Sequence, residues 1–161
     1  MTPSLDVSTP GERPASTMTL GFLAGYGYSL DLAEWIEPEG TLELFDLQQE
    51  FLDHVLRGAG ERGLANLVAT RGDATALPYA DASVDAVVLT AVLGEIPDPG
   101  AALREIRRVL APGGRLVVGE LFGDPHFTTR AALERQGAAA GLRLEERSGN
   151  CFGYFARLSP V

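Results

Sequence analysis

Short apolar runs alternate with amphipathic segments along most of the chain. Residues 84–90 (VDAVVLT) are almost continuously apolar, which is typical of a strand covered on both faces. Residues 101–110 (AALREIRRVL) carry apolar side chains three and four positions apart, which predicts a helix with one buried face. The same periodicities predict strands at 18–24, 41–45, 67–69, 115–119, 142–147 and 154–158, and helices at 29–36, 48–62 and 128–140.

This alternating order of strands and helices predicts a doubly wound α/β sheet that is mostly parallel and ends in an antiparallel edge. Residues 1–16 are rich in proline, serine and threonine and are expected to form a flexible lead-in, with residues 17–161 as a single domain. In such sheets, ligands bind beyond the carboxyl ends of the strands, where the strand order reverses. We therefore expect functional residues at the strand ends.

The amino-acid composition limits the partners and reaction types that are expected for this chain. The 161 residues include 22 acidic and 13 basic side chains, and the net charge of −9 disfavours nucleic acid as a partner. Every basic residue is an arginine, which excludes lysine-based Schiff-base or P-loop chemistry. One cysteine, Cys151, cannot build a zinc site alone, and two histidines are too few for a histidine-rich metal centre, so no metal is expected. No apolar run approaches the roughly 20 residues of a membrane helix, and no secretory signal is recognised, so a cytoplasmic location is expected.

Glycines and carboxylates follow the first three predicted strands. Gly25 and Gly27 precede the first predicted helix, where they either let the backbone approach a ligand or simply form a turn. Asp46 ends the second strand, where a carboxylate can accept hydrogen bonds from both hydroxyls of a ribose or cap the next helix. Asp73 follows the third strand, where it can accept from the amine of an adenine or act as a turn residue.

Four stretches resemble a known family: residues 72–78 (GDATALP), 82–88 (ASVDAVV), 96–99 (IPDP) and 102–116 (ALREIRRVLAPGGRL). They are similar to the class I S-adenosylmethionine-dependent methyltransferases, and most of all to the small ubiquinone/menaquinone-biosynthesis-like branch. The resemblance covers roughly residues 18–160. It implies a Rossmann-like sheet of seven strands with an antiparallel last strand, S-adenosylmethionine as cofactor, and methyl transfer to a small-molecule acceptor.

The resemblance also implies a cofactor site. Asp46 would bind the ribose hydroxyls and Asp73 the adenine amine. Phe45 and Leu47 would flank the adenine, with Ala74 beside the ring. The methionine end would be lined by Thr90 and Ala91. The implied cofactor-binding set is Ala24, Gly25, Gly27, Asp46, Leu47, Gly72, Asp73, Ala74, Thr90 and Ala91.

The first motif of the family is altered in this chain. The family has a carboxylate two residues before three alternating glycines, whereas residues 18–24 contain no acid and Ala24 stands for a glycine in one register. Gly94 occupies a position where many relatives have histidine. The alternative function is therefore a methyltransferase fold without methyl transfer, acting as a non-catalytic subunit or binding the cofactor for another reaction such as a cyclisation.

An in-line displacement on a sulfonium-activated methyl group needs orientation and a desolvated pocket, and a general base only for some nucleophiles. The candidate bases follow strand ends or lie in late loops; they are Glu95, Glu120, His126 and Tyr154. For His126, an exposed loop histidine is the alternative. Residues 152–155 are interpreted first as edge-strand core and second as a pocket wall or dimer contact, so a homodimer is among the expected assemblies.

Overall fold

The computed structural model describes residues 16–21, 25–150 and 152–161. The strands are β1 (Ser16–Gly21), β2 (Thr41–Asp46), β3 (Leu67–Arg71), β4 (Val84–Thr90), β5 (Leu110–Leu121), β6 (Leu142–Asn150) and β7 (Gly153–Pro160). The helices are α1 (Gly25–Ile36), α2 (Gln49–Arg62), α3 (Pro99–Val109) and α4 (Arg130–Ala139), with a 3₁₀ turn η1 (Leu93–Glu95).

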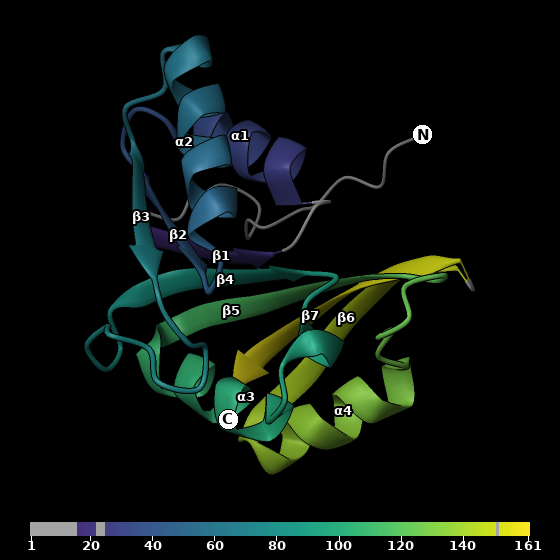
Figure 1. Ribbon diagram of the computed structural model, residues 1–161. Helices are drawn as coiled ribbons and strands as arrows, with labels where there is room; N and C mark the ends of the chain where they lie inside the picture. Colours follow the sequence, from purple (N-terminus) through teal and green to yellow (C-terminus); the bar gives the residue numbers. More distant parts are fainter. Residues whose placement is uncertain (1–15, 22–24, 151) are drawn as a thin grey trace.

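The strands form one seven-stranded sheet in the order β3-β2-β1-β4-β5-β7-β6. Four neighbouring strand pairs are parallel, namely β3–β2, β2–β1, β1–β4 and β4–β5. Strand β7 runs antiparallel to both of its neighbours, β5 and β6. The prediction of a doubly wound, Rossmann-like sheet with an antiparallel last strand is thus confirmed. Helices α1 and α2 cover one face of this sheet and α3 and α4 the other (Figure 1).

Two apolar cores lie on the two faces, and β4 contributes to both. Val87 and Leu89 belong to the core under α3 and α4, while Ala86 and Val88 belong to the core under α1 and α2. Side chains alternate between the faces of a strand, so a strand covered on both sides must be apolar at nearly every position. This is the pattern that residues 84–90 show in the sequence.

The ends of the helices follow local signals. The Asp98 carboxylate accepts a hydrogen bond from the Ala101 N–H at 2.8 Å and begins α3, with Pro99 in its first turn. Helix α2 ends at Gly63, whose φ of 73° is a left-handed conformation that glycine adopts without a steric penalty. Among the described residues, no helix has both the length and the apolar character to cross a membrane.

The first strand and helix differ from the prediction. Strand β1 ends at Gly21, and residues 22–24 lie outside the described part of the chain. Helix α1 begins at Gly25 and not at residue 29, so Gly25 and Gly27 belong to its first turn instead of a preceding loop. Glycine has low helix propensity, which is why the pattern alone places the start four residues late.

The strand predicted at 115–119 is longer than its apolar run indicates. Strand β5 begins at Leu110: Val84 pairs with Leu110 and Ala86 with Arg115, so residues 111–114 form an excursion within β5. In α2, the buried face is formed by Leu52, Val55 and Ala59, whereas Leu56 is 38% exposed.

Candidate functional site

The strand order reverses between β1 and β4, which makes their carboxyl ends the expected binding edge. Gly21 and Thr90 are register partners at this point. Two hollows lie along the edge, one over the ends of β2 and β3 and one over the ends of β4, β5 and β7. Ala91 lines one hollow and Val92 the other, so the two sites are adjacent along the chain after β4.

The first hollow, which we call the acidic cleft, has a volume of about 300 Å³. It brings together five of the residues predicted to bind the cofactor, and one candidate base, Glu95. Its lining is Asp46, Leu47, Gln48, Gly72, Asp73, Ala74, Val92, Glu95, Ile96 and Pro97. Gln48, Val92, Ile96 and Pro97 carry no chemical signal in the sequence and enter the site only because the chain folds them next to the two carboxylates.

Asp46 is the last residue of β2, on the wall of the acidic cleft. Its Oδ1 accepts a hydrogen bond from the Gln48 N–H at 2.8 Å, which fixes the carboxylate. Burial raises the pKa of this carboxyl, and hydrogen bonds from the Gln48 and Leu47 N–H groups act in the opposite direction. The N-cap of α2 is Gln48, so the alternative of Asp46 as the helix cap is wrong.

Asp73 stands on the other side of the cleft in a tight turn. Its Oδ1 accepts hydrogen bonds at 2.8 Å from both the N–H and the hydroxyl of Thr75. These two bonds lower the pKa of the carboxyl, so Asp73 is ionised and held in one orientation although it is exposed. Asp73 is therefore both a turn residue and a residue of the cleft wall.

Packing in the core explains why residue 72 is a glycine. A Cβ at this position would lie 2.5 Å from the Phe45 ring, and the neighbouring β2 and β3 ends are tied by a hydrogen bond from the Gly72 N–H to the Asp46 carbonyl at 3.0 Å. Phe45 is 1% exposed and packs edge-on against Tyr79. The expectation that Phe45 flanks the adenine is therefore wrong: its side chain points to the core face of β2, while Leu47 lies exposed on the cleft wall.

Arg108 fastens the segment that follows Asp73. Its guanidinium donates to the Leu77 and Tyr79 carbonyls at 2.9 and 2.8 Å, and forms ion pairs with Asp81 and Glu105. The Glu105 carboxylate in turn accepts from the Leu77 N–H at 2.9 Å. Helix α3 thereby fixes the loop between β3 and β4. This loop begins with the turn that contains Asp73.

Replacing Arg108 by methionine should lower the free energy of unfolding by about 2 kcal/mol, because several charge-assisted hydrogen bonds are lost and two carbonyls lose their donor. Urea unfolding measures the change. Arg104→Met, at an exposed arginine of the same helix, is the control and should change stability by less than about 0.5 kcal/mol. Equal stabilities of the two variants would contradict the fastening role.

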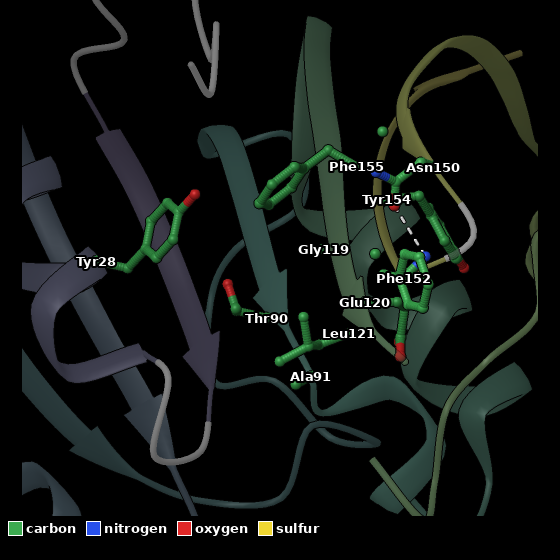
Figure 2. A pocket seen from close by; sticks show the side chains of 12 residues that line it. Tyr28, Thr90, Ala91, Gly119, Glu120, Leu121, Asn150, Phe152, Tyr154 and Phe155 are labelled. Carbon is green, nitrogen blue, oxygen red and sulfur yellow. Dashed lines mark hydrogen bonds between the residues drawn. The ribbon is translucent and has the colours of Figure 1, made fainter. Parts of the chain in front are cut away.

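The second hollow, which we call the aromatic pocket, has a volume of about 460 Å³. Thr90 and Ala91, predicted at the methionine end of the cofactor, lie between Tyr28 on one side and the side chains of β7 on the other (Figure 2). Its lining is Tyr28, Thr90, Ala91, Gly119, Glu120, Leu121, Gly149, Asn150, Phe152, Gly153, Tyr154 and Phe155. The residues interpreted as edge-strand core or pocket wall are thus both: Tyr154 is buried in the core and also lines the pocket, and Phe152 is exposed at its rim.

Two backbone features shape the floor of the aromatic pocket. Ala91 has φ 50°, a left-handed conformation that costs a residue with a Cβ about 1 kcal/mol or more and that recurs at functional sites. Its N–H donates to the Gly119 carbonyl at 2.8 Å, which holds the end of β4 against β5. Gly119 is required because the Phe155 ring lies where its Cβ would be.

Glu120 and Tyr154 are register partners on β5 and β7, and together they hold the backbone of one residue, Thr128, on both sides of its Cα. Glu120 Oε2 accepts from the Thr128 N–H at 3.2 Å, and the Tyr154 hydroxyl donates to the Thr128 carbonyl at 2.7 Å. Burial, and then the Glu120 charge, raise the pKa of Tyr154, with Arg130 over its ring acting in the opposite direction. The Tyr154 hydroxyl is thus a hydrogen-bond donor already in use, and its role as a base stays a prediction.

Burial raises the pKa of Glu120 to about 7, and the charge of Asp124 adds to the effect. A carboxyl whose pKa is higher in the folded than in the unfolded chain stabilises the fold when protonated, and this stabilisation is lost as pH rises from about 4.5 through 7. Between pH 5 and 8 the wild type should lose about 2 kcal/mol of stability that the Glu120→Gln variant retains. Urea unfolding at several pH values measures this; parallel curves would contradict it.

The remaining candidate bases lie on the outer rim. His126 Nδ1 is 4.0 Å from the Glu95 carboxylate and 3.8 Å from that of Asp124, and its side chain is mostly exposed. These three side chains place possible metal-ligand atoms within 4.8 Å of one another. Asp124 already accepts the His126 N–H at 2.7 Å, a local turn that accounts for the cluster without an ion. His126 therefore matches the alternative of an exposed loop histidine.

The altered glycine motif is only partly described. Gly25 and Gly27 start α1, where the unpaired N–H groups of a helix N-terminus are available, and Gly27 is not among the residues that line the two hollows. Gly27 is exposed, with open space where a Cβ would be. Ala24 lies outside the described residues.

The polar and the apolar residues of the site both suit S-adenosylmethionine. Asp46 and Asp73, at successive strand ends, offer acceptors for hydroxyl and amine donors, and Ala74, Ile96 and Leu47 offer apolar contact between them. The aromatic pocket begins where Thr90 and Ala91 end β4. The residues present therefore fit an adenosine group in the acidic cleft with its sulfonium end toward the aromatic pocket.

Known proteins agree with this geometry. A family model described as "Methyltransferase domain" matches residues 22–118. A demethylmenaquinone methyltransferase of Renibacterium salmoninarum is 47% identical over 120 residues, 74% of this chain and 45% of that protein. A ubiquinone/menaquinone biosynthesis C-methyltransferase of Caulobacter vibrioides is 39% identical over 80 residues, 50% of this chain and 31% of that protein. The chain thus spans less than half the length of these curated relatives.

Solved structures share the fold. A methyltransferase from Aquifex aeolicus superposes with a TM-score of 0.81 at 18% identity, covering 91% of this chain and 82% of that one. The [4+2]-cyclase SpnF superposes with a TM-score of 0.73 at 27% identity, covering 83% and 53%. Since the family model matches more than half of the sequence and the sheet has the order and strand directions described above, the chain belongs to the class I S-adenosylmethionine-dependent methyltransferases, in the ubiquinone/menaquinone-biosynthesis-like branch.

Proposed function

We propose that this protein transfers the methyl group of S-adenosylmethionine to a small-molecule acceptor held in the aromatic pocket. The observation that carries the proposal is the adjacency of the two hollows, one lined by the carboxylates of Asp46 and Asp73 and the other by aromatic side chains. Ala91 lines the aromatic pocket, and Val92, the next residue after β4, lines the acidic cleft. The named activity of the quinone methyltransferase relatives supports the reaction class.

The chain's own residues contribute orientation and desolvation. When bound, the sulfonium of the cofactor supplies an activated methyl group, so the protein needs no metal or covalent nucleophile for this reaction. Asp46 and Asp73 would fix the adenosine, and Thr90 and Ala91 would lie at its methionine end. Tyr28, Phe152 and Phe155 line the space beside them with aromatic rings, and an acceptor bound there would be held for an in-line attack on a methyl carbon.

Calorimetric titration with S-adenosylhomocysteine tests cofactor binding, and a rise of the melting temperature with ligand concentration should accompany it. Turnover is then measured as S-adenosylhomocysteine formed from S-adenosylmethionine in the presence of candidate acceptors. Folded protein that gives neither heat nor a melting shift at millimolar ligand would overturn the proposal.

The structural likeness to a [4+2]-cyclase favours one second candidate, a fold that retains the cofactor while the pocket performs a rearrangement. The mass of the product separates the two functions, because methyl transfer adds one CH₂ unit and a rearrangement adds nothing. A third outcome, a non-catalytic subunit, would give partner binding that is unaffected by loss of the Asp46 carboxylate. The cytoplasmic location and the homodimer remain predictions, and light scattering after gel filtration measures the latter.

A further inference from the structure

Two residues, Leu47 and Gln48, join β2 to α2 and line the acidic cleft. The peptide group between them touches the carboxylate at the end of β2, because the Gln48 N–H donates to Asp46 Oδ1 at 2.8 Å. Its carbonyl oxygen, that of Leu47, lies before the hydrogen-bond ladder of α2, in which the Gln48 carbonyl accepts from the Leu52 N–H at 3.3 Å. The orientation of this one peptide group therefore determines how Asp46 is held.

Arg71 holds the other end of the same peptide group. It is the last residue of β3 and the register partner of Asp46. Its Nε donates to the Leu47 carbonyl at 3.0 Å, and the N–H of the next residue, Gly72, donates to the Asp46 carbonyl at 3.0 Å. A peptide group is planar, so its oxygen and its N–H turn together. By fixing the oxygen, Arg71 also fixes the N–H that donates to the Asp46 carboxylate.

Arg71 acts on the cleft through this backbone contact. Its side chain is exposed, and it is not among the described residues that line the acidic cleft. Leu47 and Gln48 are exposed as well, so packing contributes little to their position and the hydrogen bonds from β3 contribute more. A donor on the carbonyl oxygen also polarises the peptide group and strengthens the hydrogen bond that its N–H makes.

We propose that Arg71 is a positioning residue of the cofactor site, which holds the Asp46 carboxylate in the orientation that accepts the two ribose hydroxyls. The inference rests on the proposed function, because it takes the acidic cleft as the adenosine site. It gives an exposed arginine of an edge strand a role in binding, although this arginine lies outside the cleft lining.

Two variants separate the hydrogen bond from the charge. Glutamine Nε2 and methionine Cε lie the same number of bonds from Cα as arginine Nε. Arg71→Gln therefore keeps a donor at this place without the charge, whereas Arg71→Met removes both. Arg147→Met, at an exposed arginine of the opposite edge strand β6, is the control. Circular dichroism and urea unfolding check that each full-length variant is folded.

The test compares the affinities for S-adenosylhomocysteine and for its analogue without the two ribose hydroxyls, both measured by calorimetry. The wild type should prefer the natural ligand by about 100-fold, since two hydrogen bonds to a charged group are lost with the hydroxyls. Arg71→Met should lower this preference to about 10-fold and leave the affinity for the analogue within about twofold. Arg71→Gln and Arg147→Met should stay within about threefold of the wild-type preference.

Amide hydrogen exchange gives a second measurement that needs no ligand. The Gln48 N–H should exchange faster in Arg71→Met than in the wild type and in Arg71→Gln, because the peptide group is then free to turn away from Asp46. A general loss of stability would instead speed the exchange of many amides and weaken both ligands equally.

The inference is overturned by an unchanged hydroxyl preference in Arg71→Met, by an equal loss of affinity for both ligands, or by Arg71→Gln behaving like Arg71→Met. A wild type that binds both ligands equally would also overturn it, while cofactor binding and the proposed function would stand. If S-adenosylhomocysteine does not bind to the folded wild type, the methyl transfer proposal is lost as well.

Discussion

The variant Asp46→Ala is expected to bind S-adenosylhomocysteine about 100-fold more weakly than the wild type. A ribose places two hydroxyls where one carboxylate at the end of β2 can accept both. Two hydrogen bonds to a charged group are together worth about 3 kcal/mol, which corresponds to roughly two orders of magnitude in affinity. Isothermal titration calorimetry at constant salt measures the change.

Asp53→Ala is the matched control for this variant. Asp53 is an exposed carboxylate on α2 that accepts from the Gln49 side chain at 2.9 Å and does not line the acidic cleft. Its loss should leave the dissociation constant within about twofold of the wild type, since an exposed pair contributes little. The Asp46 variant must also be checked for folding, because the Gln48 N–H loses its acceptor. An unchanged affinity in folded Asp46→Ala would remove Asp46 from the cofactor site.

The second large effect is expected at Gly94, in the turn after β4. A Cβ on this residue would collide with the O and C atoms of the His126 carbonyl group, which are backbone atoms and cannot rotate away as a side chain could. The two loops at the rim of the acidic cleft must then move apart, so Gly94→Ala should lower the free energy of unfolding by about 3 kcal/mol. Urea unfolding gives the value, and a weaker affinity for S-adenosylhomocysteine should follow because Glu95, Ile96 and Pro97 line the cleft.

Gly60→Ala provides the comparison on an exposed part of α2. No atom lies within 4 Å of its added Cβ, so alanine should stabilise the helix by about 0.5–1 kcal/mol. The two substitutions are chemically identical and are expected to change stability in opposite directions. A Gly94→Ala variant as stable as the wild type would show that the contact between the two loops is not retained in solution.

The structure also explains why residue 94 is a glycine in this chain. Many relatives have histidine at this position, and here the backbone of His126 occupies the space that any side chain would need. The backbone of the loop after β5 thus occupies the space that a side chain at position 94 would need. The residue types near positions 94 and 126 do not predict this contact, because the two positions are 32 residues apart and are brought together only by the folding of the sheet.

The sequence by itself determined the fold class and the places where function should lie. The apolar run of β4 and the amphipathic pattern of α3 depend on periodicities of 2 and 3.6 residues, which are local and can be read directly. The positions of Asp46 and Asp73 at successive strand ends follow from the same alternation, and both line the acidic cleft. Boundaries were less well determined, and α1 begins four residues earlier than its pattern indicates.

Only the tertiary structure decided which way side chains point and which of them meet. Phe45 and Asp46 are neighbours in sequence, yet one lies in the core and the other at the cleft, because successive residues of a strand face opposite sides. Tyr154 and Glu120 were equal candidates as bases, but their antiparallel register and their shared hold on Thr128 leave Tyr154 a donor and Glu120 with an unsatisfied oxygen. Burial and partner geometry are properties of residues far apart along the chain, so local sequence carries no record of them.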